Sequence, residues 1–147
     1  MALLDTIKTI IELASPKDSD NNPTYTVHYE ESKMMNIKVD ELKVSDSFVY
    51  IEEFISGKYT QEKFFKSKSM KMQIYFCKFS EFQCDAIDRQ TKRDLIEEEI
   101  IEPFMQKYKE SGLFDEVQAW NIFYPFPRFD ANEVSVMLEF DCKVKRC

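Results

Sequence analysis

The chain has 147 residues, a formal net charge of −7, and 44% apolar and 32% charged residues. This composition is typical of a globular domain with one core, and it disfavours a disordered chain or a membrane protein. No apolar run reaches the roughly 20 residues of a membrane helix, and two glycines in the whole chain exclude the glycine-rich loops that bind nucleotide phosphates. With one histidine and cysteines spaced too widely for the usual zinc pairs, we expect neither a metal nor a cofactor.

A first helix is predicted over Ala2–Ala14, where apolar residues recur at intervals of three and four. Two acids, Asp5 and Glu12, fall inside this pattern, and no basic leader precedes it. We therefore interpret the segment as a helix of the mature protein and not as a signal peptide, and we expect the protein to stay in the compartment where it is made. The prolines, asparagines and aspartates of residues 15–23 predict a loop after the helix.

Four strands are predicted next, because the period of the apolar residues changes to two. They cover residues 25–30, 35–42, 47–60 and 70–82. The third begins apolar on both faces, which favours a place inside a sheet. Residues 57–73, which join the last two of these strands, hold five lysines and one glutamate. Their net charge of +4 leaves −11 on the rest of the chain.

A long helix is predicted over Asp85–Ser111. Its apolar stripe recurs at four or five residues and comprises Ile87, Thr91, Leu95, Ile100, Phe104 and Tyr108. Asp85 is suited to the N-cap, and Gly112 to a left-handed end of the helix. Pro103 cannot donate a hydrogen bond to the carbonyl oxygen of Glu99, so we expect a kink or a fresh helix start there.

Two strands, 117–124 and 132–145, close the chain, and the second has one unbroken apolar face. The resulting order is α-β-β-β-β-α-β-β. This order predicts one α+β domain over residues 1–147, in which an antiparallel β-sheet is packed on one face by two helices. Pro125 and Pro127 cannot donate to a ladder, so the chain must leave the sheet between the two strands.

Opposite charges on two elements indicate an assembly surface. A basic arm on one copy and an acidic helix on the next would form a heterologous contact, which closes into a ring. The residues that we expect in this contact are Lys58, Lys63, Lys66 and Lys68 on the arm, and Glu98 and Glu102 on the helix. A plain hairpin kept soluble by its lysines is the alternative interpretation. The negative remainder of the chain would repel a polyanion, so we expect no nucleic-acid partner. Because no apolar run is long enough for a membrane helix, we also expect no membrane partner.

The turn before the last strand carries more aromatic surface than a corner requires, and an arginine lies within it. Its candidate contact residues are Tyr124, Phe126, Arg128 and Phe129. We expect these residues to bind a protein partner and not to form a catalytic pocket. No catalytic motif occurs elsewhere in the sequence, so we expect no enzymatic activity.

In its element order and in its ending, "FDANEVSVMLEFDCKV", the chain resembles the tail terminator, or minor tail, proteins of long-tailed phages. The likeness covers the N-terminal helix, the long hairpin with a basic tip, the helix from Asp85 and the closing strand pair. It implies a structural protein without enzymatic activity that forms a ring, expected to have six copies, on the finished tail tube. The loop Pro125–Asn132 would then contact the tube or the head-tail connector. The resemblance also implies the cytoplasm of a bacterial host, and then the virion tail, as the location.

A small cytosolic binding domain is the alternative to this phage protein. Thirteen phenylalanines could line a pocket that holds a hydrophobic ligand or peptide between sheet and helix, yet they serve an ordinary core equally well. The two hypotheses differ in the mass of the particle in solution, because the first predicts a ring and the second a monomer.

Overall fold

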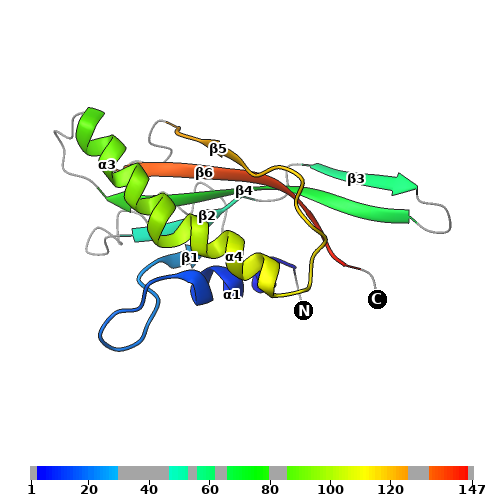
Figure 1. Cartoon of the computed structure of the whole chain (residues 1–147), viewed down its shortest axis with the longest axis horizontal. Coiled ribbons are helices and arrows are strands. Elements are labelled where there is room, and N and C mark those ends of the chain that lie inside the picture. The colour runs from blue at the N-terminus through cyan, green and yellow to red at the C-terminus, as the bar shows by residue number, and fades with distance from the viewer. Residues whose placement is uncertain are drawn as a thin grey trace.

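The computed structural model of this chain describes residues 3–29, 47–52, 56–61, 66–79, 86–125 and 133–145. These residues form a six-stranded sheet with helices on one face (Figure 1). The predicted α+β class is confirmed, and the order of helices and strands largely follows the expected one. The strand expected at 35–42 lies outside the described residues. Within the described ranges, no helix is both long and apolar enough to cross a membrane.

The sheet is built around β4, and its strand order is β1-β2-β4-β6-β5, with β3 paired to the outer part of β4. The strands are β1 (Thr26–His28), β2 (Ser47–Ile51), β3 (Ser56–Gln61), β4 (Lys66–Phe79), β5 (Asn121–Phe123) and β6 (Glu133–Lys143). The β1–β2 pair is parallel, whereas the other pairs are antiparallel. The expected antiparallel sheet is therefore wrong at this edge, because an alternating pattern does not reveal the direction of a strand. Parallel neighbours need a connection of a dozen or more residues, and eighteen separate His28 from Ser47.

The long helix changes its hydrogen-bonding register in the middle. It comprises α3 (Ala86–Ile96), the π-helical segment η1 (Glu97–Ile101) and α4 (Glu102–Glu110). The N–H of Glu102 donates to the carbonyl oxygen of Glu97, five residues back, and Pro103 follows in the first turn of α4. A proline lacks the N–H, and its ring collides with the carbonyl group four residues back. The π turn relieves this conflict, so the fresh start expected at Pro103 is an α-helix that resumes directly after a π segment.

The main core fills the space between the sheet and the helices α1 (Leu3–Ala14), η1 and α4 (Figure 1). Phe104 lies at its centre, with its ring centre 6.1 Å from those of Phe76 and Phe140. The apolar stripe predicted for the long helix, which includes Ile96, is correct for η1 and α4 but wrong for most of α3, where Ile87 is 76% and Leu95 40% exposed and Ile96 alone is buried. The reason is the place of α3 in the fold, since it crosses the sheet where β4 ends and β6 begins (Figure 1).

The opposite face of the sheet divides into an apolar half and a polar half. The apolar half is a second buried cluster, which comprises Phe48, Tyr50, Tyr75, Cys77 and Met137. Further along the same face, β4 and β6 carry Lys71, Gln73, Glu139 and Asp141, in two directly opposed pairs. Burial of this face therefore ends about halfway along β4.

β2 and β3 follow one another along the same edge of β4. β2 pairs with the inner part of β4, from Ile74 to Lys78, and β3 with the outer part, from Lys66 to Lys71. The single strand predicted over 47–60 is thus two separate strands. Because β6 pairs with β4 only from Ser69 onward, the hairpin of β3 and the first residues of β4 projects beyond the body of the sheet (Figure 1).

Candidate subunit interface

The projecting hairpin exposes every residue of β3. All six side chains from Ser56 to Gln61 are exposed, and Tyr59 keeps 68% of its surface open. Among the described strands, β3 pairs only with β4, so the main-chain groups of its outer edge face outward. A strand of serine, glycine, lysine, threonine and glutamine offers little apolar surface for another element to cover, and lysine on an edge disfavours indiscriminate strand addition.

Two of the predicted lysines, Lys58 and Lys68, lie on different faces of the hairpin. Lys58 lies opposite Ser69, and Lys68 lies opposite Tyr59. Because successive residues of a strand point to opposite faces, Lys58 and Lys68 point in opposite directions. The Nζ atom of Lys68 lies 5.4 Å from the ring centre of Tyr59, within the range of a cation–π contact.

Two of the predicted lysines are placed only in part or not at all. Lys66 stands in register with Gln61 at the outer end of the ladder. Lys63 lies outside the described residues. The structure therefore places Lys58 and Lys68 on a common projecting element, on opposite faces of it.

The predicted acids are exposed on the long helix. Glu98 lies in η1 and Glu102 begins α4, and both side chains are exposed. In the part of the chain that the structure describes, no group of three or more potential metal ligands occurs. The hairpin projects from one end of the sheet, whereas η1 lies over its middle (Figure 1). One copy therefore does not bring Lys58 and Lys68 of its hairpin to its own acids, and a contact between these described residues requires a second copy.

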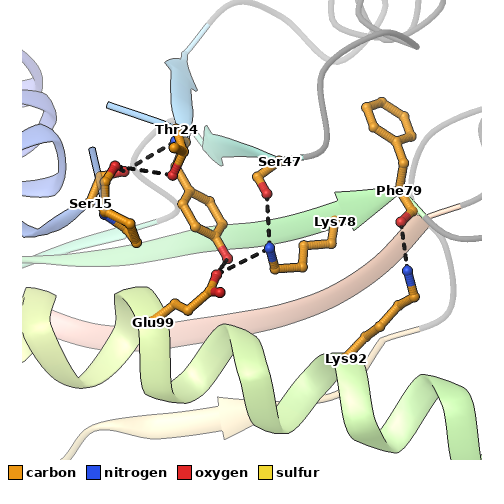
Figure 2. Close-up of polar contacts among 9 residues, drawn as sticks. Ser15, Thr24, Ser47, Lys78, Phe79, Lys92 and Glu99 are labelled. Carbon is orange, nitrogen blue, oxygen red and sulfur yellow. Dashed lines mark hydrogen bonds and ion pairs between the residues drawn. The ribbon is translucent and has the colours of Figure 1, made fainter. Parts of the chain in front are cut away.

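Glu99, the neighbour of Glu98, points inward to a polar cluster (Figure 2). Its Oε2 atom accepts a hydrogen bond of 2.9 Å from the Tyr25 hydroxyl and lies 3.1 Å from Nζ of Lys78. Lys78 in turn donates to the Ser47 hydroxyl at 3.1 Å, and its ammonium group lies 5.1 Å from the ring centre of Tyr25. Burial and the Glu99 carboxylate raise the pKa of Tyr25, so its phenol remains a hydrogen-bond donor.

This polar cluster fixes the rotation of η1 against the sheet. It joins the helix to β4, to β2 and to the residue before β1. A further bond from Nζ of Lys92 to the carbonyl oxygen of Phe79, 3.0 Å long, ties α3 to the end of β4 (Figure 2). With Glu99 held inward, Glu98 remains on the outer side. Sequence reasoning missed this cluster, because its members lie far apart in the chain and no local pattern links them.

Tyr124 directly follows β5 and takes part in an internal contact. Its hydroxyl donates to Oε1 of Glu97 at 2.5 Å, and the Arg93 guanidinium lies 5.3 Å from its ring centre. The bond to Glu97 raises the pKa of Tyr124 to about 12. Since 48% of its surface is nevertheless exposed, Tyr124 can still meet a partner. Phe126, Arg128 and Phe129 lie outside the described residues.

Tyr59 lies on the projecting hairpin, but the subunit contact predicted from the sequence did not include it. Tyrosine is enriched among the residues that dominate protein interfaces, and here it stands exposed beside a lysine on a projecting strand. The feature of the sequence that could have identified Tyr59 is an aromatic residue at a polar position of a lysine-rich strand.

No protein-family model matches the chain, and no curated protein matches it. The function is therefore inferred from the surfaces described above and from the resemblance of the sequence.

Proposed function

We propose that this protein is a structural component of a long-tailed phage or prophage, a ring-forming tail terminator that caps the tail tube and joins it to the head-tail connector. It acts without catalysis and without a cofactor, in the cytoplasm of the bacterial host during assembly and then in the virion tail. The observation that carries this proposal is the projecting hairpin, whose β3 strand is exposed along its whole length, together with exposed acids on a separate element of the same chain.

The proposed contact joins the hairpin of one copy to the outer face of η1 and α4 in the next. Such a contact uses two different surfaces, so it is heterologous and closes into a ring, for which we propose six copies. Single exposed ion pairs contribute only about 0.2–1 kcal/mol each, so charge sets the orientation and approach of the copies. Tyr59 supplies the apolar area that the charges lack.

The exposed edge near Tyr124 is the proposed surface for the tail tube or the connector. It comprises Ile122, Phe123 and Tyr124, which are 38%, 47% and 48% exposed. Apolar residues exposed side by side are typical of a protein contact. A site on β5 leaves the hairpin and the acids for contacts within the ring.

Charge reversal tests the ring. We expect native mass spectrometry and light scattering at low salt to detect a ring that dissociates as the salt concentration rises. Lys58→Glu combined with Lys68→Glu should give monomers, and adding Glu98→Lys and Glu102→Lys should restore the ring. Lys17→Glu, an exposed reversal in the loop that follows α1, is the control and should leave the ring intact.

The single variants define the face of the hairpin that is used. Because Lys58 and Lys68 point in opposite directions, one of the two single reversals should weaken assembly more than the other. A ring that survives the double reversal at low salt contradicts the proposed contact. A monomer at all concentrations, with and without isolated tails, contradicts the ring itself.

The alternative function, a domain that holds a hydrophobic ligand between sheet and helix, has no comparable support. Packed side chains occupy the space between these layers. The ring centre of Phe104, for example, lies 6.2 Å from that of Trp120 and 6.1 Å from that of Phe140. A thermal-shift screen with fatty acids and apolar peptides tests this alternative. Stabilisation by such a ligand would favour the binding domain over the terminator.

A further inference from the structure

β5 is the last strand of the sheet, on the side away from β1 and β2 (Figure 1). Among the described strands it pairs only with β6, through Asn121, Ile122 and Phe123. All three residues are exposed, and so is Tyr124, which follows them. In the described part of the chain, the outer edge of β5 is therefore open.

The main-chain groups of alternate β6 residues point toward β5. Near the end of β6, the N–H of Lys145 donates to the carbonyl oxygen of Leu113, and the carbonyl oxygen of Lys143 accepts from the N–H of Asp115. β6 pairs with β4 residue by residue over its whole length, so it has no bulge. Because the bonding side alternates along a regular strand, the odd-numbered residues of β6 offer their main-chain groups to β5.

Ile122 consequently points its own main-chain N–H and C=O groups outward. Asn121 stands opposite Glu139, and Phe123 stands opposite Met137. These are the pairs that exchange hydrogen bonds, so the groups of Ile122, which lies between them, are on the free edge. No described residue bonds to them. Unpaired main-chain groups on a strand edge are a template for an added strand.

The side chains of β5 differ from those of the other open edge, β3. β3 carries a lysine, which disfavours strand addition, whereas β5 reads Asn-Ile-Phe and has no charge. Ile122 stands opposite Leu138 of the main core, so it points to the helical face. Phe123 stands opposite Met137 of the second cluster, so it points to the other face. An added strand would find an apolar side chain on each face.

A cation stands beside this edge on the helical face. The Arg93 guanidinium lies 5.3 Å from the ring centre of Tyr124. Among the described residues, its Nε has no hydrogen-bond partner and the guanidinium has no ion pair. Two acids of the same helix are bonded elsewhere, Glu97 to the Tyr124 hydroxyl and Asp94 to the Gln90 amide at 2.8 Å. A guanidinium with donors to spare favours a carboxylate from a partner.

We propose that β5 binds an extended segment of its tail partner as an added strand, with a carboxylate of that segment beside Arg93. The strand runs antiparallel to β5, because antiparallel pairing is the more stable per residue. This inference rests on the proposed function for the identity of the partner, the tube or connector protein. It adds the way in which that partner is held.

The register fixes the order of side chains in the segment. The residue opposite Ile122 shares its helical face, and so does the residue two places earlier, which lies beside Tyr124 and Arg93. The earlier residue is the acid, and the one opposite Ile122 is apolar. The residue between them points to the other face and meets Phe123, so it is apolar as well. The segment thus reads acid-apolar-apolar.

Titration of the ¹⁵N-labelled protein with a blocked peptide tests this site by NMR. The probe is acetyl-Thr-Glu-Val-Val-Thr-amide, which carries the expected order. We expect a shift of the Ile122 amide, because its N–H donates to the bound peptide, and a smaller shift of the neighbouring Tyr124 amide. Absence of both shifts at millimolar peptide would overturn the proposal.

Two N-methylated peptides distinguish an added strand from a contact of side chains alone. A methyl group on the second valine nitrogen removes the donor to the Ile122 carbonyl oxygen, and it should weaken binding about tenfold. The same group on the first valine nitrogen faces away from β5 and should change the affinity by less than about twofold. Equal losses from the two methyl groups, or a greater loss from the first, would contradict the antiparallel strand.

A double-mutant cycle tests the role of Arg93. Arg93→Gln should weaken the peptide that contains glutamate by roughly two- to fivefold, as for an exposed ion pair. It should leave unchanged the affinity for the peptide with glutamine in place of glutamate. Lys17→Gln, in the exposed loop after α1, is the control and should affect neither peptide. Equal weakening of both peptides by Arg93→Gln would mean that Arg93 only supports Tyr124.

This site and the proposed function fail separately. A protein that binds isolated tails but none of these peptides would retain the proposed function and lose the added strand. A protein that binds the peptides, yet forms no ring and binds no tails, would retain the strand site and lose the proposed function.

Discussion

β2 and β3 pair with the same edge of the same strand, yet their environments are opposite. All five residues of β2 are buried, and all six of β3 are exposed. Both run antiparallel to β4 and both place a tyrosine in the middle of the ladder, Tyr50 opposite Tyr75 and Tyr59 opposite Lys68. The hydrogen-bonded ladder is therefore common to both, and the difference lies in what covers them. β2 contributes to stability, whereas β3 is available for contacts with other molecules.

The difference also follows from side-chain chemistry. β2 reads Ser-Phe-Val-Tyr-Ile and β3 reads Ser-Gly-Lys-Tyr-Thr-Gln. Burial of a large apolar side chain contributes about 1.5–3 kcal/mol, which β2 gains on both faces and β3 on neither. Strand formation in β3 thus depends on its pairing with β4.

The largest expected effect comes from removing the two tyrosines in turn. Tyr50→Ala should lower the free energy of unfolding by about 3–5 kcal/mol, as for other buried aromatic side chains, because Tyr50 is 1% exposed. Tyr59→Ala should change it by no more than about 0.5 kcal/mol, as is usual for surface positions. Urea denaturation of the two variants measures both values. Similar losses for both would show that the hairpin is part of the cooperative core.

Substitution of two neighbouring acids on the helix should have a smaller effect on the free energy of unfolding. Glu99 points inward, whereas Glu98 is exposed. Glu99→Ala removes the partner of Tyr25 and Lys78 and should cost about 1–2 kcal/mol, the lower part of the range for bonds to charged groups, because the Glu99 side chain is 30% exposed. Glu98→Ala, which has no such partner among the described residues, should change the free energy of unfolding by no more than about 0.5 kcal/mol. Thermal and urea unfolding measure the difference. If Glu98→Ala proved as costly as Glu99→Ala, the inward cluster would not be what orients η1.

The smallest effect on the free energy of unfolding is expected at the exposed edge near β5. This edge differs from β3 because Tyr124 forms a hydrogen bond with Glu97 of the long helix. Tyr124→Phe removes the bond to Glu97 and should cost about 0.5–1 kcal/mol. Because the pKa of Tyr124 in the fold, about 12, lies above the usual 10.0, this bond contributes fully below about pH 10 and is lost as the pH rises through about 12. NMR of ¹³C-labelled tyrosine, assigned with Tyr124→Phe, measures the titration.

A matched variant checks the cause of this raised pKa. Glu97→Gln should return the pKa of Tyr124 toward 10, because the neutral amide no longer stabilises the protonated phenol. Glu98→Gln should leave it unchanged. A Tyr124 that titrates near 10 in the unmodified protein would mean that the bond to Glu97 is not maintained in solution.

Local sequence patterns gave good predictions for helices and strands that bury one face in the core. The apolar spacing of Ile7, Ile10 and Ile11 identified α1, and the alternation from Val134 to Cys142 identified β6, because both patterns follow from one buried face. The same reasoning misjudged Ile87 and Leu95, whose helical spacing is correct but whose helix end crosses the margin of the sheet. Periodicity states which side chains share a face, not whether another element covers that face.

The candidate surfaces could be predicted only in part. The sequence indicated the lysines and the acids of the proposed contact, but not that Lys58 and Lys68 point in opposite directions. That division depends on the register of β3 against β4, which is a pairing between two segments. The inward turn of Glu99 and the exposed position of Tyr59 depend likewise on partners distant in the chain.

The sequence by itself determined the α+β class, most of the helices and strands, the exit from the sheet at Pro125, and the opposite charges of arm and helix. These properties follow from composition, periodicity and the covalent limits of proline, all of which act over a few neighbouring residues. Only the tertiary structure decided the parallel β1–β2 pair, the separation of β2 from β3, and the polar cluster around Glu99. Each of these depends on which distant segments pair or pack, and that choice is made by the whole core at once.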